Sequence, residues 1–108
     1  MKTNHVTLIG YVGNDLSATE SKNGSKRLVI LMSTHYPRKS SDGKKLWQTV
    51  WHYVVTWDRI AEYAERNFVK GSKILVVGTL LYLSYADNTG HTRYSTQIKA
   101  SSLMNLDR

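Results

Sequence analysis

The sequence lacks cysteine altogether, and it holds one proline, one phenylalanine and only eight acidic side chains among its 108 residues. The absence of cysteine excludes disulfide bonds, thiolate metal sites and cysteine nucleophiles. No apolar run approaches the roughly 18 residues that a membrane-spanning helix needs, and the first residues lead into a strand pattern rather than a signal sequence. We therefore expect a soluble, cytoplasmic protein that does not bind membranes.

Positive charge is what the sequence has in excess. Fifteen lysine and arginine residues stand against eight aspartate and glutamate residues, which gives a formal net charge of +7. Such a surface attracts polyanions and makes nucleic acid the first candidate partner, although net charge alone fits an uninvolved basic surface equally well. The length and the 41% hydrophobic content fit a single globular domain over residues 1–108.

Alternating apolar and polar residues predict β-strands along most of the chain. The first strand covers Val6–Val12 and ends in the turn Gly13–Asp15. A turn-rich stretch, Thr19–Ser25, precedes a second strand at Arg27–Thr34, which is rich in β-branched and aliphatic residues. The next segment, Pro37–Lys45, holds the only proline and four cations against one carboxylate, so we expect an exposed, flexible hairpin loop.

A long third strand is predicted at Leu46–Trp57, and it carries all three tryptophans. Because side chains alternate along a strand, one face of this strand carries more aromatic rings than the other. That face presents Trp47, Thr49, Trp51, Tyr53, Val55 and Trp57.

The remaining sequence predicts one helix and two strands. Apolar residues recur at helical spacing from Ile60 to Phe68, and Gly71 follows as a stop signal. Strands at Lys73–Tyr85 and His91–Ala100 flank a turn sequence. This order predicts an all-β fold with one helix: a five-stranded Greek-key OB-fold barrel in which the helix lies between strands three and four.

Several segments together resemble the bacterial single-stranded-DNA-binding protein family. The resemblance covers almost the whole chain and is carried by Val6–Gly13, Gln48–Val55, Ala61–Glu62, Lys70–Ile74, Val77–Leu80, Asp87–Gly90 and Arg93–Thr96. It implies an OB fold, usually assembled as a homotetramer, that wraps single-stranded DNA during replication, repair and recombination. It also implies a nucleoid-associated location.

The resemblance also assigns roles to individual residues. Family aromatics that stack on bases fall here on Trp51, Trp57 and Tyr85. A further family aromatic aligns with Tyr36 or Pro37, and we choose Tyr36 because only it offers a π-face. The histidine that follows the central tryptophan matches His52, which resembles a subunit-contact residue.

Binding without sequence preference needs flat aromatic faces for the bases, and each stack contributes about 1–3 kcal/mol. From periodicity alone, Trp51 and Trp57 are equally compatible with the barrel core. The resemblance favours binding. We expect Trp47 and Tyr53, on the same face, to be supporting or packing residues.

Basic side chains are expected to contact the phosphates by releasing counterions. The candidates are Arg38, Lys39, Lys44 and Lys45 in the basic loop, and Arg93 and Lys99 on the last strand. The family usually carries basic residues before the aromatic tip of the fourth strand, whereas this chain has Leu81–Leu83. Phosphate binding is therefore expected to rely on the loop.

The C-terminus is a second departure from the family. Family members typically carry a disordered linker and an acidic tip that recruits other replication proteins, but this chain stops after Asp107-Arg108. We therefore expect no acidic tail for recruitment. The sequence leaves open whether a tail was removed or was never present.

Catalysis has no recognisable set of residues in this sequence. The four histidines are scattered without metal-ligand spacing, and the helix pair Glu62 and Glu65 fits a solvated face. We expect no enzyme activity, no metal and no other cofactor. Two alternatives to DNA binding stay open: single-stranded RNA as the ligand, and an OB subunit whose aromatics lie in a protein interface.

Overall fold

The computed structural model describes residues 3–107, and within them six strands and one helix follow one another along the chain. The elements are β1 (Val6–Val12), β2 (Thr19–Glu20), β3 (Lys26–Lys39), β4 (Lys45–Trp57), α1 (Asp58–Asn67), β5 (Lys73–Ala86) and β6 (Thr92–Asn105).

The strands form one sheet in the order β1-β5-β6-β4-β3-β2. The sheet closes on itself because β1 also pairs with β3, through Tyr11 with Ser33 and Val12 with Met32. Gly10 allows this close approach, since a Cβ atom there would collide with the carbonyl oxygen of Ser33. The five strands β1, β3, β4, β5 and β6 therefore make the closed barrel of an OB fold, as predicted.

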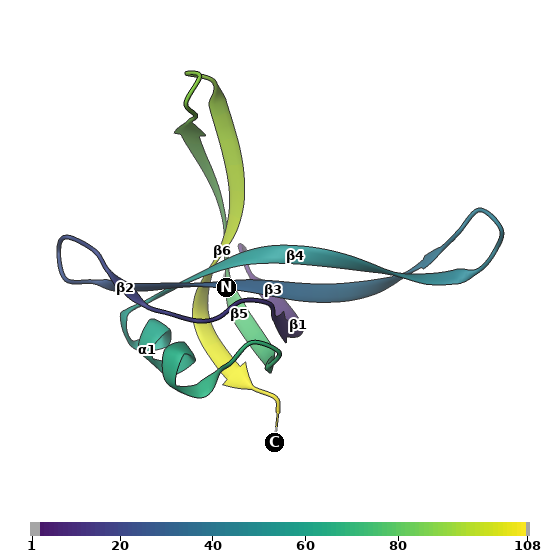
Figure 1. Cartoon of the computed structure of the whole chain (residues 1–108), viewed down its shortest axis with the longest axis horizontal. Helices are drawn as coiled ribbons and strands as arrows, with labels where there is room; N and C mark the ends of the chain where they lie inside the picture. Colours follow the sequence, from purple (N-terminus) through teal and green to yellow (C-terminus); the bar gives the residue numbers. More distant parts are fainter. Residues whose placement is uncertain (1–2, 108) are drawn as a thin grey trace.

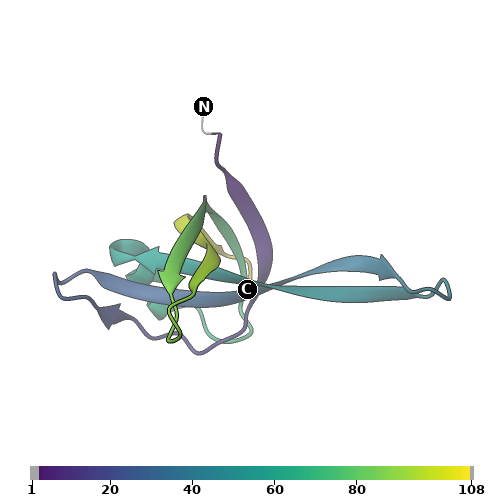
Figure 2. The same cartoon turned by 90° about the horizontal axis from the view of Figure 1, so that it is seen from above.

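Two strand pairs project from this barrel. β3 and β4 pair along their whole length, from Arg27 with Trp57 at one end to Lys39 with Lys45 at the other. The outer halves of these two strands have no third strand beside them. We call residues 34–50 the β3–β4 ribbon. β5 and β6 form a second projecting hairpin, and Figure 1 shows that the two point away from the barrel in different directions. Figure 2 shows the ribbon extending well past the rest of the chain.

The core lies inside the barrel and is closed by α1 at one end. Alternation along β3 and β4 turns the even-numbered residues inward, and Thr56 Oγ1 in this layer donates a 2.8 Å hydrogen bond to the carbonyl of Leu28. The helix contributes its buried face, as its apolar spacing predicts. Core side chains include Leu28, Ile30, Met32, Val54, Ala61, Ala64, Phe68, Ile74 and Val76.

Several predicted boundaries were wrong. Thr19–Glu20, expected to be part of a turn, forms the short strand β2, so the helix lies between β4 and β5 in chain numbering. It still lies between the third and fourth barrel strands. Pro37–Lys39 belong to β3 rather than to a loop, which leaves residues 40–44 as the connection. A strand with only one neighbour accommodates proline because half of its backbone groups face solvent.

Candidate nucleic-acid interface

The β3–β4 pairing sorts the candidate residues onto two faces. Residues paired across an antiparallel ribbon share a face, so Trp51 lies with Ser33 and Trp57 lies with Arg27. This outer face carries the odd-numbered residues of β3 and β4. The even-numbered residues lie on the opposite face, which becomes the barrel interior toward the base of the ribbon.

Aromatic side chains follow the outer face of β4. Trp47 is 67% exposed and Trp51 is 60% exposed, so neither is a core residue. Tyr53 is also exposed, and Trp57 at the end of the strand is half-buried. Four rings on one side of one strand make a track of accessible π-faces, the arrangement that base stacking requires. The core alternative for Trp51 is excluded.

Cations accompany this aromatic track at both ends. The Arg27 guanidinium lies 5.9 Å from the centre of the Trp57 ring, and the Lys45 ammonium lies 6.0 Å from that of Trp47. Both distances are within the range of a cation–π interaction. Lys99 joins the same face, because it pairs with Val55 across β6 and β4. The track therefore combines stacking surfaces with positive charge.

Trp47 is not among the predicted stacking residues. It was expected to support or pack, but it is the most exposed tryptophan and pairs with Pro37 on the outer face. Alternation along the strand was the available signal, because Trp47 and Trp51 are separated by an even number of positions and therefore share a face. Alternation alone does not say which face of a strand is turned to solvent.

Tyr36 does not lie with the other predicted stacking residues. It pairs with Gln48 on the opposite face of the ribbon, and its side chain is 48% exposed. Arg38 shares that face, since its Nη1 donates a 3.0 Å hydrogen bond to Oε1 of Gln48. Successive residues of a strand point to opposite faces. Tyr36 therefore lies on the face opposite Trp51, whereas Pro37 shares the face of Trp51.

The remaining loop cations lie near the ribbon tip. Lys39 pairs with Lys45 on the outer face, and a hollow of about 370 Å³ lies against Pro37, Arg38, Lys39 and Lys45. Lys44 belongs to the connecting turn, where its carbonyl oxygen accepts a 2.9 Å hydrogen bond from the amide of Ser40. The predicted loop cations therefore surround one tip but divide between its two faces.

The connecting turn is held by its own hydrogen bonds. The Ser40 hydroxyl donates to the carboxylate of Asp42, and the amide of Lys44 donates to the same group. These bonds, with Ser40 first, hold the pKa of Asp42 below its ordinary value of 3.8. The single carboxylate of the ribbon therefore stays charged at neutral pH and is occupied within the turn.

Tyr85 lies on the second hairpin and shares a face with Arg93, its cross-strand partner. Arg93 is already paired, because its Nε donates a 2.8 Å hydrogen bond to Asp87. This bond, followed by the hydroxyl of Thr89, lowers the pKa of Asp87 to about 2. A phosphate contact by Arg93 would therefore compete with the Asp87 carboxylate.

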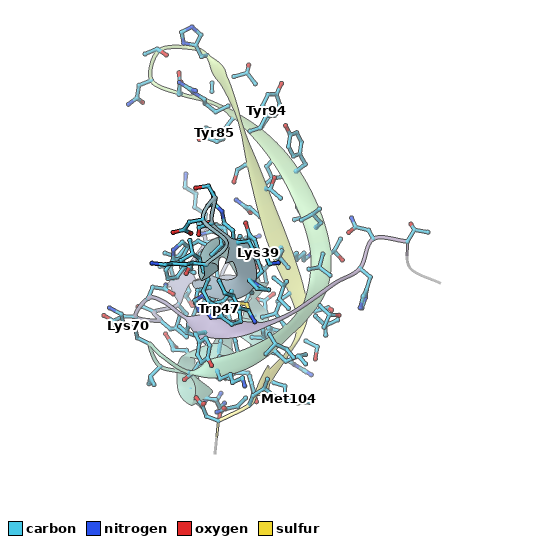
Figure 3. The ribbon with its side chains drawn as sticks, turned by 90° about the vertical axis from the view of Figure 1, so that its right-hand side faces the viewer. Lys39, Trp47, Lys70, Tyr85, Tyr94 and Met104 are labelled. Carbon is cyan, nitrogen blue, oxygen red and sulfur yellow. The ribbon has the colours of Figure 1, made fainter. Side chains whose placement is uncertain are left out.

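The other face of this hairpin carries a tyrosine pair. Tyr82 and Tyr94 stack with ring centres 5.2 Å apart and planes 16° apart, and both rings are well exposed. Figure 3 shows Tyr85 and Tyr94 on opposite sides of the hairpin. The hairpin thus presents aromatic surface on both sides, and only Tyr85 shares the face of Arg93.

His52 lies on the inner face of β4, next to Trp51 in sequence but on the other side of the strand. Its Nε2 and the hydroxyl of Thr34 are hydrogen-bonded at 2.8 Å. Partial burial lowers the pKa of His52 below its ordinary value of 6.5. The face of His52 separates it from the aromatic track.

Two carboxylates of α1 make contacts within the fold. Glu62 lies 3.3 Å from the ammonium of Lys26, and Glu65 accepts a 2.7 Å hydrogen bond from the amide of Ala18. Within residues 3–107, no three histidine or acidic side chains are grouped as a metal site would require. Nor does any helix in that range have the length and apolarity needed to cross a membrane.

Comparison with known proteins gives consistent matches. A sequence profile described as the single-strand binding protein family matches residues 3–106. Single-stranded DNA-binding protein 1 of Chlorobaculum tepidum is 32% identical over 104 residues, covering 95% of this chain and 64% of that protein. The single-stranded DNA-binding protein of Xanthomonas axonopodis pv. citri is 34% identical over 103 residues, covering 95% and 57%. The chain spans about three fifths of these relatives.

Solved structures share the fold. A Plasmodium falciparum SSB complex with ssDNA superposes with a TM-score of 0.88 at 24% identity, covering 99% of this chain and 97% of that chain. A deletion mutant of the single-stranded DNA binding protein from Thermus aquaticus gives a TM-score of 0.82 at 23% identity, covering 96% and 50%. At these identities the likeness concerns the fold, and it matches the OB barrel described above.

Proposed function

This chain belongs to the single-strand binding protein family, and from that premise we propose that it coats and protects single-stranded DNA without sequence preference. Replication, repair and recombination are the processes in which such a protein acts. One domain, residues 1–108, carries the activity. The proposal includes no catalysis and no cofactor, since stacking and charge neutralisation need neither.

The aromatic track on β4 is the observation that carries this proposal. Single exposed apolar side chains are normal, but rings that follow one face of a strand mark an interaction surface, and here Trp47 and Trp51 are both well exposed on the same face. The rings at both ends have a cation within 6.0 Å. Bases stack on the rings while the cations contact the phosphates, which is a sequence-independent mode of binding.

The stacking residues of the proposal are Trp51, Trp57 and Tyr85, with Trp47 added from its exposure. Trp47 takes the outer-face position opposite Pro37, which is one of the two positions, Tyr36 or Pro37, with which the family aromatic aligns. The phosphate contacts on this face are Lys39, Lys45 and Lys99, with Lys44 at the turn and Arg93 shared with its carboxylate partner.

Assembly into a homo-oligomer, as a homotetramer, is part of the same proposal. Two features of the outer surface support it. The Val6–Ile9 segment of β1 pairs with β5 along one edge only, within the described residues, so its other edge offers unpaired backbone groups. Next to that edge, Ile9 pairs with Leu75 on β5, and Leu75 pairs with Met104 on β6, so the three side chains share a face. Ile9 and Met104 are more than half exposed and offer an apolar surface to a second subunit.

His52 is the proposed subunit contact. His52→Asp would add a charge at the half-buried inner face of β4 and is expected to disturb assembly before it disturbs the fold. Sedimentation of this variant tests the assignment, and a fully assembled His52→Asp protein would remove it. The cytoplasmic, nucleoid-associated location belongs to the proposal as well, because single-stranded DNA is the partner that would place the protein there.

Titration of tryptophan fluorescence with poly(dT) tests the function. We expect strong quenching, because the stacking candidates include all three tryptophans, and an affinity that falls as salt rises. Duplex DNA of equal phosphate content is the control for charge alone, and a matched RNA oligomer is the control for the sugar. Equal binding to duplex DNA, or no quenching, would contradict the proposed function and would mean that this OB-fold protein has another partner.

A further inference from the structure

The chain turns from strand into helix at one residue, Asp58. β4 ends at Trp57 and α1 begins at Asp58, with no loop between them, as Figure 1 shows. The backbone of Asp58 makes this turn with a φ of 50°, which lies in the left-handed region. Among the non-glycine residues that the structure describes, Asp58 alone has a positive φ. After glycine, aspartate and asparagine are among the residues that tolerate this conformation best.

The carboxylate of Asp58 holds the neighbouring strand at this turn. The last pair of the β3–β4 register is Arg27 with Trp57. If β4 continued, the next pair would be Lys26 with Asp58. In place of that pair, Oδ1 of Asp58 accepts a 3.1 Å hydrogen bond from the backbone amide of Lys26. The side chain therefore extends the contact between the two strands by one residue while the backbone leaves the sheet.

This hydrogen bond lies beside the last ring of the aromatic track. Trp57 directly precedes Asp58, and Arg27 directly follows Lys26. The Arg27 guanidinium lies 5.9 Å from the centre of the Trp57 ring. The two partners of this cation–π contact are therefore the sequence neighbours of the two residues that share the hydrogen bond.

We infer that Asp58 is a positioning residue for Trp57. Its left-handed backbone directs the end of β4, and its carboxylate fixes that end against β3, so the Trp57 ring and the Arg27 guanidinium keep one arrangement. A ring that is already ordered stacks on a base more favourably, because ordering a side chain during binding costs part of the binding free energy. This inference rests on the proposed function, in which Trp57 stacks on a base, and adds the residue that orients the ring.

Three substitutions separate the backbone of Asp58 from its carboxylate. Asp58→Asn keeps a tolerated left-handed backbone and an oxygen acceptor, Asp58→Gly keeps only the backbone, and Asp58→Ala keeps neither. All three remove the same negative charge, so differences between them do not arise from net charge. Asp58 is exposed, and circular dichroism with thermal melting should show that each variant is folded at the temperature of the measurements.

The fluorescence of Trp57 reports the position of its ring without DNA. Trp47→Phe and Trp51→Phe leave Trp57 as the only tryptophan. In this background Asp58→Asn should keep the emission maximum and the acrylamide quenching that Asp58 gives. Asp58→Gly and Asp58→Ala should shift the emission to longer wavelength and increase the quenching. A residue that only stabilised the fold would leave both readouts unchanged well below the melting temperature.

Isothermal titration with oligo(dT), in the protein with all three tryptophans, measures the consequence for binding. Asp58→Gly should bind about threefold more weakly than Asp58→Asn, a smaller loss than that expected for Trp57→Ala, because the ring is loosened rather than removed. In a Trp57→Ala background the same two variants should bind alike, since no ring is left to position.

The possible failures are distinguishable. Equal emission and quenching in Asp58→Asn and Asp58→Gly would overturn the positioning role and leave the proposed function standing. Equal affinity of these two variants for oligo(dT), or a difference in affinity that persists in the Trp57→Ala background, would overturn it too. Absence of binding to any single strand would instead defeat the proposed function, and the emission of Trp57 would still decide whether Asp58 orients the ring.

Discussion

The indole ring of Trp51 lies directly on the backbone of Gly13, where β1 ends. A Cβ atom at residue 13 would collide with Cζ3 of that ring and lie 2.8 Å from its Cη2. Gly13 is fixed in turn by its amide, which donates a 2.7 Å hydrogen bond to the carbonyl of Leu31. The orientation of the central ring of the track is therefore set by a residue that cannot stack on DNA.

Gly13→Ala is expected to tilt the Trp51 ring and weaken binding to poly(dT). The loss should stay below the roughly 1–3 kcal/mol expected for Trp51→Ala, because the ring is moved rather than removed. Both variants should remain folded, since the ring is exposed. A double-mutant cycle measured by fluorescence titration checks the mechanism: if Gly13→Ala still weakens binding in the Trp51→Ala protein, it acts by another route.

Trp47→Ala is expected to weaken binding of single-stranded DNA by about 1–3 kcal/mol, as loss of one stacked base should. Its high exposure means that the melting temperature should hardly change. Isothermal titration with oligo(dT) gives the affinity. Tyr63→Ala, which removes an exposed ring from α1 outside the track, is the matched control. Equal losses in the two variants would argue against a specific role for Trp47.

Asp87→Asn is expected to strengthen binding of single-stranded DNA several-fold, because it releases Arg93 from its carboxylate partner. The slope of affinity against salt concentration should become steeper by up to about one counterion, since one more cation becomes available to a phosphate. Arg93→Ala in the Asp87→Asn background should abolish the gain. An unchanged salt slope would mean that Arg93 lies outside the DNA path.

The stability of the protein should fall as pH drops below the ordinary pKa of histidine, about 6.5. Burial lowers the pKa of His52 in the folded state, so the unfolded chain takes up its proton first as pH falls. The stabilisation is complete above pH 6.5 and is lost as pH falls toward the lowered pKa. Melting temperatures at about pH 7.5 and about pH 5.5 measure the loss.

His52→Gln is expected to reduce this pH dependence, because glutamine cannot be protonated in that range. His35→Gln, at an exposed position on the outer face, serves as the control and should retain the dependence. If both variants behave like the original protein, a group other than His52 is responsible.

The barrel strands and the helix were predictable because their residues carry a periodic signal. Alternation located β1, β4 and β5, and the spacing of Ala61, Ala64 and Phe68 located the buried face of α1. β2 gave no such signal, since two exposed residues cannot establish a period. The outer part of β3 was hidden by Pro37, which terminates central strands but is tolerated where a strand has one neighbour.

The site was predictable in its chemistry more than in its geometry. Aromatic and basic residues were recognised, but alternation alone could not say whether the face of Trp51 was turned inward or outward. That depends on which layer the rest of the barrel fills, and here it is the layer of Val54 and Thr56. The choice between Tyr36 and Pro37 for the family aromatic decides its face, because the strand period of two places neighbouring residues on opposite faces.

The closing of the barrel by β1 also determines the order in which the molecule can fold. The two hairpins join strands that are close in sequence, whereas β1 pairs with β5, which lies near the other end of the chain. Local hairpins form before distant strands meet, so pulse-labelling hydrogen exchange should protect amides of β3 and β4 before those of β1. During synthesis β1 leaves the ribosome before β5 and must wait for it, and until then the hydrophobic interior remains open to chaperones.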